Sequence, residues 1–131
     1  MMDRKILEDM KAKHRVLTEY SFAKKPLHRG YNNRTLYVNV GTLEIKEKPV
    51  SEEMKEKFVG GKGFGLRLLW DGVTEKTRWN DPENEINIAV GPVGGNTNYP
   101  GSGKSLVVSL SPLTDIPIDS NVGGHFGPYL K

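Results

Sequence analysis

The sequence predicts an α+β fold, and two kinds of pattern lead to this class. Runs in which apolar and polar residues alternate, such as residues 34–40 and 43–48, are typical of half-buried strands. Residues 52–59 follow a serine and end before two glycines, which is typical of a short helix. We therefore expect five or so short strands and two or three short helices in one ordinary domain.

Composition limits the classes of protein to which the chain can belong. Its 131 residues are 36% hydrophobic and 27% charged, which fits a rather polar domain with a real core. The absence of cysteine excludes disulfides, thiolate-bound metals and iron–sulfur clusters within this chain. No apolar run approaches the roughly 18 residues of a membrane span, and the start lacks the apolar segment of a secretory signal. We expect a cytoplasmic protein that has no membrane partner.

The net charge of +3 is concentrated near the start, because residues 1–30 carry eight Lys or Arg and four acids. Residues 31–131 carry eleven basic and twelve acidic residues and are nearly neutral. We predict that residues 1–30 form a basic extension and residues 31–131 a partial domain. No motif interleaves aromatic and basic residues as RNA-binding motifs do, so we expect no nucleic-acid partner.

The extension is predicted to contain a helix over residues 3–20, followed by a loop. Ile6, Met10 and Val16-Leu17 form one narrow apolar stripe along it. An isolated helix of this length is marginal without a surface to pack on. Two interpretations stay open: a surface helix or frayed terminus, and an arm that docks on a partner chain.

The body begins with a predicted hairpin, in which residues 34–40 and 43–48 pair across the turn Gly41-Thr42. Ser51 is the expected N-cap of the helix over residues 52–59, whose first turn carries two carboxylates. That helix should stop at the two glycines that follow it.

A second helix is predicted from Lys62 to Asp71. Its start, with Lys62 and Gly63 inside a glycine-rich junction, presents free amides and a positive charge to an anion. The same glycines also suit an elbow where two helices pack closely. Spacing alone does not decide between these interpretations.

The second half of the body alternates between polar loops and short strands. Residues 72–85 are polar and rich in turn formers, whereas residues 86–90 have the pattern of a strand. Residues 106–110 should form its neighbour. Residues 116–118 are expected to be extended at a sheet edge, because a proline lies among them.

Two glycine clusters flank the apolar run 106–110, one before it and one around Gly123-Gly124. Glycine at this density serves tight turns or main chain that lies against a ligand. We predict a backbone cradle at each end of the buried strand, which binds an anionic cofactor through amides and Lys104. The alternative for Lys104 is an ordinary solvated turn lysine.

The sequence offers no catalytic set. Gly103-Lys104-Ser105 is not a P-loop, because Asn98 stands where that motif needs glycine and a strand follows instead of a helix. His125 could act as a general base or could simply face solvent. Asp119 is expected in a loop, where acids are common. We therefore predict no catalytic residue in this chain.

A series of motifs resembles the start of the aldehyde:ferredoxin oxidoreductase family of tungsten (sometimes molybdenum) bis-pterin enzymes. In order, they are Tyr-Val-Asn-Val, Phe-Val-Gly-Gly-Lys-Gly-Phe-Gly, Asp-Pro-Glu-Asn-Glu-Ile, Ala-Val-Gly-Pro-Val, Pro-Gly-Ser-Gly-Lys-Ser, Ser-Pro-Leu-Thr and Asp-Ser-Asn-Val-Gly-Gly-His-Phe-Gly-Pro-Tyr-Leu-Lys. The resemblance covers residues 34–131. It implies the β-rich first half of the family's N-terminal domain, which carries the tungstopterin, with sheet edges completed by another chain or copy.

The resemblance also implies which residues contact the cofactor. Lys104 stands where the family commonly has an arginine that meets the pterin, and lysine keeps the charge without the bidentate geometry. Asn121 corresponds to the residue whose main-chain carbonyl holds a magnesium ion between the pterin phosphates. Gly123 and its neighbour Gly124 would lie against the cofactor, and Lys62 with Gly63 would be weaker candidates on the phosphate side.

Activity is then expected only with further polypeptide, because the family's cluster-binding cysteines and acid/base residues belong to later domains. The resemblance implies a cofactor-binding small subunit or fragment of an enzyme that oxidises aldehydes to acids, with ferredoxin as the indirect electron acceptor. The expected partner is a larger cysteine-containing subunit that carries the iron–sulfur cluster, or a second copy. The alternative is a stand-alone interaction or assembly domain without redox chemistry.

Overall fold

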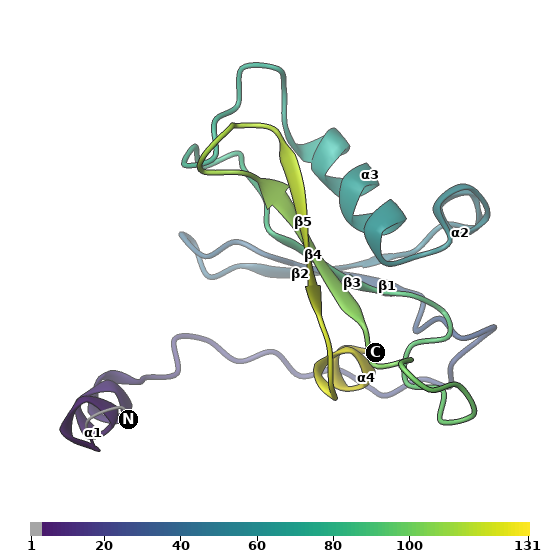
Figure 1. Cartoon of the computed structure of the whole chain (residues 1–131), viewed down its shortest axis with the longest axis horizontal. Helices are drawn as coiled ribbons and strands as arrows, with labels where there is room; N and C mark the ends of the chain where they lie inside the picture. Colours follow the sequence, from purple (N-terminus) through teal and green to yellow (C-terminus); the bar gives the residue numbers. More distant parts are fainter. Residues whose placement is uncertain (1–3) are drawn as a thin grey trace. The chain divides into compact units, whose positions relative to one another are not determined.

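The computed structural model describes residues 4–131, which form four helices and five strands (Figure 1). The strands make one two-stranded and one three-stranded sheet, so the predicted α+β class is confirmed. Among the described residues there is one helix more than the two or three that the sequence predicts. The chain divides into two compact units, which are described separately. No helix among residues 4–131 has the length and apolar character needed to cross a membrane.

The first unit contains the described residues up to Lys24 together with Thr35–Lys48. Its helix α1, Arg4–Lys13, buries none of its residues. The prediction of a helix over residues 3–20 was therefore wrong at its C-terminal end, because residues 14–20 have no regular structure; residue 3 lies outside the described residues. Val, Thr and Tyr in that stretch are weak helix formers, and an exposed helix gains no packing to offset them.

The hairpin of the first unit is confirmed: strands β1, Arg34–Val38, and β2, Ile45–Pro49, form the two-stranded sheet. The Asn39 side-chain oxygen accepts hydrogen bonds of 2.9 Å from both amides of the predicted turn. Leu43 has a positive φ of 61° and is not yet part of the second strand. This longer turn explains why the second strand begins two residues later than predicted.

The second unit is built on an antiparallel sheet of three strands, β3, β4 and β5, with the bounds Asn87–Val90, Ser105–Leu110 and Pro117–Val122. In the pairing register, Leu106 lies between Ala89 and Asn121. Strand β5 is longer than the predicted extended segment, and Asp119, expected in a loop, pairs with Val108 inside the strand. Pairing with β4 thus outweighs the polar composition of β5.

Two helices precede this sheet. Helix α2, Glu52–Phe58, is capped as predicted, because the Ser51 hydroxyl accepts a hydrogen bond of 3.1 Å from the Met54 amide. Helix α3, Lys62–Gly72, packs on β3 and β4 (Figure 1). Val59, the C-cap residue of α2, has a positive φ of 61°, so α2 ends at Phe58, just before Val59 and the two glycines.

The core of the second unit lies between α3 and β4. Leu69, Val108 and Leu110 are buried together, with Val73 packed against them. A Cβ atom at Gly65 would lie 2.6 Å from a methyl carbon of Val108, so this glycine is what allows helix and strand to approach so closely.

The opposite face of the sheet is less covered. Side chains alternate between the two faces of a strand, so Ile88, Val107 and Ile118 point away from α3. Ile88 and Ile118 are 45% and 52% exposed. The sheet therefore keeps an uncharged apolar area on this side.

Helix α4, Phe126–Leu130, was not predicted. It has one turn and contains Gly127 and Pro128, so no helical periodicity could reveal it. Helix α4 packs on the sheet through Gly127, which is buried. A Cβ atom at this position would lie 3.2 Å from a methyl carbon of Val90. The helix therefore closes one end of the face that α3 leaves open (Figure 1).

Candidate functional site

The two glycine clusters meet at one end of the sheet. Ser105, the first residue of β4, pairs with Val122, the last residue of β5. The end of the loop 91–104 and the start of the turn 123–125 therefore lie next to each other. The prediction of one cradle at each end of the buried strand was wrong, because β5 reverses the chain and brings the second cluster back beside the first.

Several of these glycines serve contact between the two main-chain segments. A Cβ atom at Gly103 would collide with the carbonyl group of Gly124, and one at Gly127 would lie 2.9 Å from the Gly103 oxygen. Gly101 and Gly124 differ from them. Both have positive φ, +77° and +86°, and a Cβ atom at either position would meet only open space. The space beside Gly101 and Gly124 is therefore open.

Lys104 lies at the junction of the two clusters. Its ammonium nitrogen is 3.9 Å from the position that a Cβ atom of Gly123 would occupy. Lys104 is exposed, and among residues 4–131 no hydrogen bond or ion pair holds its ammonium group. The structure therefore brings Lys104, Gly123 and Gly124 together as a positive charge beside bare main chain.

Asn121 is close to this group but belongs to strand β5. It pairs with Leu106, and its side chain is exposed on the face that α3 covers. Its two predicted functions, contact with the cofactor and a carbonyl ligand for magnesium, stay predictions. Asn121 precedes Gly123 by two residues along the chain. Its pairing with Leu106 places it at the same end of the sheet as Lys104.

Lys62 also reaches this face of the sheet, but its charge is already paired. Its ammonium group lies 2.6 Å from an Asp119 carboxylate oxygen, and the two side chains are 55% and 26% exposed. An ion pair this exposed contributes little to stability, but it cancels the local charge of Lys62. Asp119 is a residue that the sequence analysis did not connect with the site, because strand pairing alone brings it there.

Gly63 fits the elbow interpretation of the helix junction. A Cβ atom at this position would collide with the main-chain carbonyl of Phe58. The close turn from α2 into α3 therefore requires glycine here, whatever else the junction contacts. The predicted role of Gly63 in cofactor binding stays a prediction.

His125 precedes the first residue of α4. It has helical φ and ψ values of −93° and −7°, and its side chain makes no capping hydrogen bond. The imidazole is exposed. Its geometry fits a solvent-facing residue better than a general base, which needs a partner that orients the ring.

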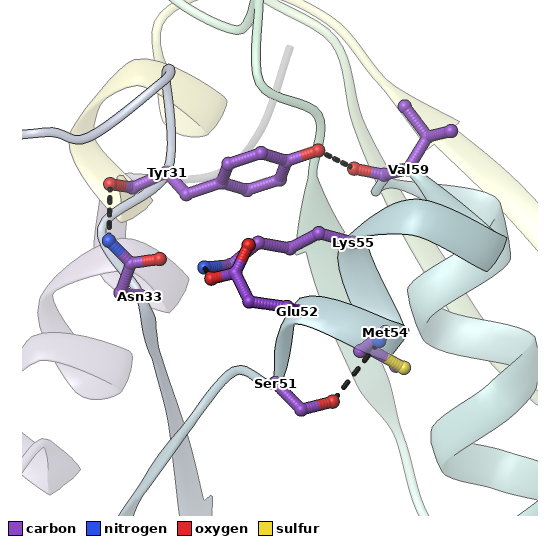
Figure 2. A network of polar contacts seen from close by, with 7 residues as sticks. All are labelled: Tyr31, Asn33, Ser51, Glu52, Met54, Lys55 and Val59. Carbon is purple, nitrogen blue, oxygen red and sulfur yellow. Dashed lines mark hydrogen bonds and ion pairs between the residues drawn. The ribbon is translucent and has the colours of Figure 1, made fainter.

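The elbow that carries Lys62 is braced by Tyr31 (Figure 2). The Tyr31 hydroxyl donates a hydrogen bond of 2.6 Å to the carbonyl of Val59, and its ring stacks on Phe64 with centroids 6.2 Å apart. The Lys55 ammonium lies 5.5 Å from the same ring and 2.6 Å from the Glu52 carboxylate. The hydrogen bond and the charge of Lys55 lower the pKa of Glu52.

Comparison with known proteins identifies the fold. Residues 35–131 match the family model described as "Aldehyde ferredoxin oxidoreductase, N-terminal domain". The chain belongs to this family. The resemblance seen in the sequence motifs is thereby confirmed for the family and for the N-terminal domain.

Individual relatives agree with this assignment. Tungsten-containing aldehyde ferredoxin oxidoreductases of Pyrococcus horikoshii and Pyrococcus furiosus are each 38% identical to the chain, over 78% and 75% of its length. A P. furiosus protein named "Aliphatic sulfonate oxidoreductase, WOR-like subunit" is 36% identical over 77% of the chain. The chain spans only 16–17% of the length of these curated relatives.

A solved structure shows the same fold. It is the active-site complex BamBC of benzoyl coenzyme A reductase with 1,5-dienoyl-CoA. The superposition has a TM-score of 0.73 at 28% sequence identity, and it covers 77% of this chain and 15% of the other. The region shared with all these proteins is therefore one N-terminal piece of much longer polypeptides.

Proposed function

We propose that this domain binds the phosphate end of a tungstopterin or molybdopterin cofactor within an aldehyde-oxidising enzyme. The observation that carries the proposal is the unpaired Lys104 ammonium beside the bare main chain of Gly123 and Gly124. A phosphate needs positive charge and donors that can approach closely, and main chain without side chains provides such an approach. When bound, the cofactor supplies the redox chemistry of its metal.

Within this proposal each residue has a distinct task. Lys104 provides the charge, as a flexible point charge and not as a planar fork. Gly123 and Gly124 let the ligand reach the main chain. Asn121 offers its carbonyl oxygen to a magnesium ion, which is a ligand type that magnesium prefers.

Lys62 is the secondary cation of the site. It can contribute to anion binding only when it leaves Asp119 or shares its ammonium protons between the carboxylate and the phosphate. Gly63 keeps the elbow tight enough to hold Lys62 at this position.

The rest of the enzyme is proposed to come from further polypeptide. The relatives are roughly four to five times as long as this chain, because the 102 and 98 matched residues make up only 17% and 16% of their lengths. We propose a larger, cysteine-containing partner that carries the iron–sulfur cluster, transfers electrons to ferredoxin and completes the sheet edges. A test is co-expression of this chain with such a polypeptide, followed by measurement of tungsten and of aldehyde oxidation.

The phosphate site can be tested in this chain alone with inorganic pyrophosphate as the probe. Amide chemical shifts of Gly123 and Gly124 should move on titration, while those of α1 should not. Lys104→Gln should weaken the affinity by roughly tenfold to a hundredfold, which is the usual range for losing one charge-assisted hydrogen bond. Lys76→Gln is the matched control, because Lys76 is an exposed lysine in a distant loop. Equal affinities of the two variants would contradict the proposal.

A second function is favoured by a different observation, the uncharged apolar area around Ile88, Val107 and Ile118. A domain that kept the fold without the chemistry would use this face as an assembly surface. In that case Ile118→Lys should abolish self-association in sedimentation experiments, and pyrophosphate should not bind at the glycine clusters.

A further inference from the structure

The ammonium group of Lys131 is partly buried and is held by main-chain carbonyl groups of the same domain. It donates hydrogen bonds of 2.5 Å to the carbonyl oxygen of Pro92 and of 2.9 Å to that of Gly94. Both are main-chain acceptors in the loop that contains the first glycine cluster. Partial burial of the group lowers the pKa of Lys131. A lysine is rarely withdrawn from water unless its donors are satisfied.

The same residue is fixed from a second direction. The Asn32 side-chain nitrogen donates a hydrogen bond of 2.6 Å to the main-chain oxygen of Lys131. Gly30, in the turn before Asn32, has a positive φ of +82°, and a Cβ atom there would collide with the Pro92 carbonyl. The turn 28–32, the loop 91–95 and the end of α4 therefore converge on Lys131.

The other end of the same loop rests on α4 as well. A Cβ atom at Gly127 would lie 2.9 Å from the oxygen of Gly103 and 3.2 Å from that of Lys104. Near the start of the loop, a Cβ atom at Gly95 would lie 3.2 Å from the Cβ atom of Pro128. Helix α4 thus contacts the loop 91–104 near its start and again at its end, beside Lys104.

A helix of five residues does not persist by itself. It needs tertiary contacts, and α4 offers few apolar ones, because Phe126, Tyr129 and Leu130 are all substantially exposed. Hydrogen bonds from a charged donor are roughly twice as strong as neutral ones. The two bonds of Lys131 are therefore the strongest polar link between α4 and the loop 91–95.

We propose that Lys131 is a positioning residue: by clamping the carbonyls of Pro92 and Gly94, it holds α4 against the loop 91–104 and so sets the place of Lys104. The clamp is a property of this chain alone. Its consequence for ligand binding rests on the proposed function of Lys104.

The direct test observes the clamp in the unmodified chain. Nuclear magnetic resonance of the Lys131 side chain should show a slowly exchanging ammonium group with scalar couplings to the carbonyl carbons of Pro92 and Gly94. The exposed Lys76 provides the internal reference and should show neither feature. An ammonium group of Lys131 that exchanges as fast as that of Lys76 would overturn the proposal.

The second test removes the charge and keeps the stem. In Lys131→Met, the amides of Gly94 and Gly95, which bond within the loop to Gly91 and Ser102, should exchange at least about tenfold faster. The amide of Val108 in β4 should keep its rate, and Lys76→Met should change none of these amides. Uniform acceleration over loop and sheet would show general destabilisation and refute a positioning role.

The pyrophosphate titration then separates the two proposals. Weaker binding by Lys131→Met, together with local loosening of the loop, supports both. If the loop loosens in Lys131→Met but pyrophosphate does not bind even to the unmodified chain, the proposed role of Lys131 is supported and the proposed function is refuted. Unchanged binding despite a loosened loop overturns the claim that Lys131 sets the place of Lys104.

Discussion

Replacement of Gly65 by alanine tests the packing of α3 on the sheet. Alanine in the middle of a helix normally stabilises by about 0.5–1 kcal/mol relative to glycine. Here the added methyl group would lie 2.6 Å from a methyl carbon of Val108, whereas carbon atoms in contact prefer about 3.5–4.0 Å. Val108 is fully buried and β-branched, so its side chain has no free rotamer to move into.

The clash should therefore exceed the gain in helix propensity. Overpacking of a core costs about 1–3 kcal/mol and the propensity gain is about 0.5–1 kcal/mol, so Gly65→Ala should lower the free energy of unfolding by up to about 2.5 kcal/mol. Gly72→Ala is the matched control in the same helix. Its added methyl group would meet only the end of the flexible Glu85 side chain, so its effect should be small.

Urea unfolding followed by circular dichroism measures these differences. A double-mutant cycle makes the test sharper, because truncating Val108 to alanine removes the methyl carbon at 2.6 Å and leaves only the Cβ atom, 3.0 Å from the added methyl group. In that background, Gly65→Ala should destabilise the domain less than it does in the unmodified protein. If Gly65→Ala stabilises the unmodified protein, or has the same effect in both backgrounds, the close approach of α3 to β4 is wrong.

Three further predictions concern the core, the surface ion pairs and the site. Leu69→Ala should lower the free energy of unfolding by about 2–5 kcal/mol, the range for a buried leucine, and an unchanged urea midpoint would contradict its place in the core. The pKa of Glu52 is lowered by its hydrogen bond to Lys55, so its contribution to stability is present above pH 4.5 and is lost as the pH falls through the lowered pKa. Acid titrations of Lys55→Met and of the unmodified protein should therefore differ below that pH, and high salt should reduce the difference. Asp119→Asn should release Lys62 and strengthen pyrophosphate binding several-fold in a calorimetric titration, whereas weaker binding would show that Asp119 supports the site.

Local patterns in the sequence were sufficient for most elements. Alternation of apolar residues revealed the hairpin of β1 and β2, and the pattern of residues 86–90 revealed β3. The apolar run 106–110 revealed β4, and Ser51 marked the start of α2 because its hydroxyl caps the first turn. These signals depend only on neighbours along the chain. Residues 14–20 show the limit of such reasoning, since an apolar stripe without a packing surface does not sustain a helix.

The arrangement of the site depends on contacts between distant residues, and these were not predictable. The polar composition of β5 suggested a loop, yet its pairing with β4 turns Asp119 toward Lys62 and brings Gly123 beside Lys104. Lys131 offered no local signal at all, because its partners belong to a loop far away along the chain. The family motifs suggested candidate residues, and only the fold shows which of their charges are already paired.

The link between Asn32 and Lys131 joins positions that are 99 residues apart. The strands, the glycine clusters and α4 lie much closer together in sequence, so their contacts close short loops and can form early in folding. The longer loop is entropically more costly to close and gains little until α4 is in place. We therefore expect the contact between Asn32 and the main-chain oxygen of Lys131 to form late in folding, after the strands and α4 are in place.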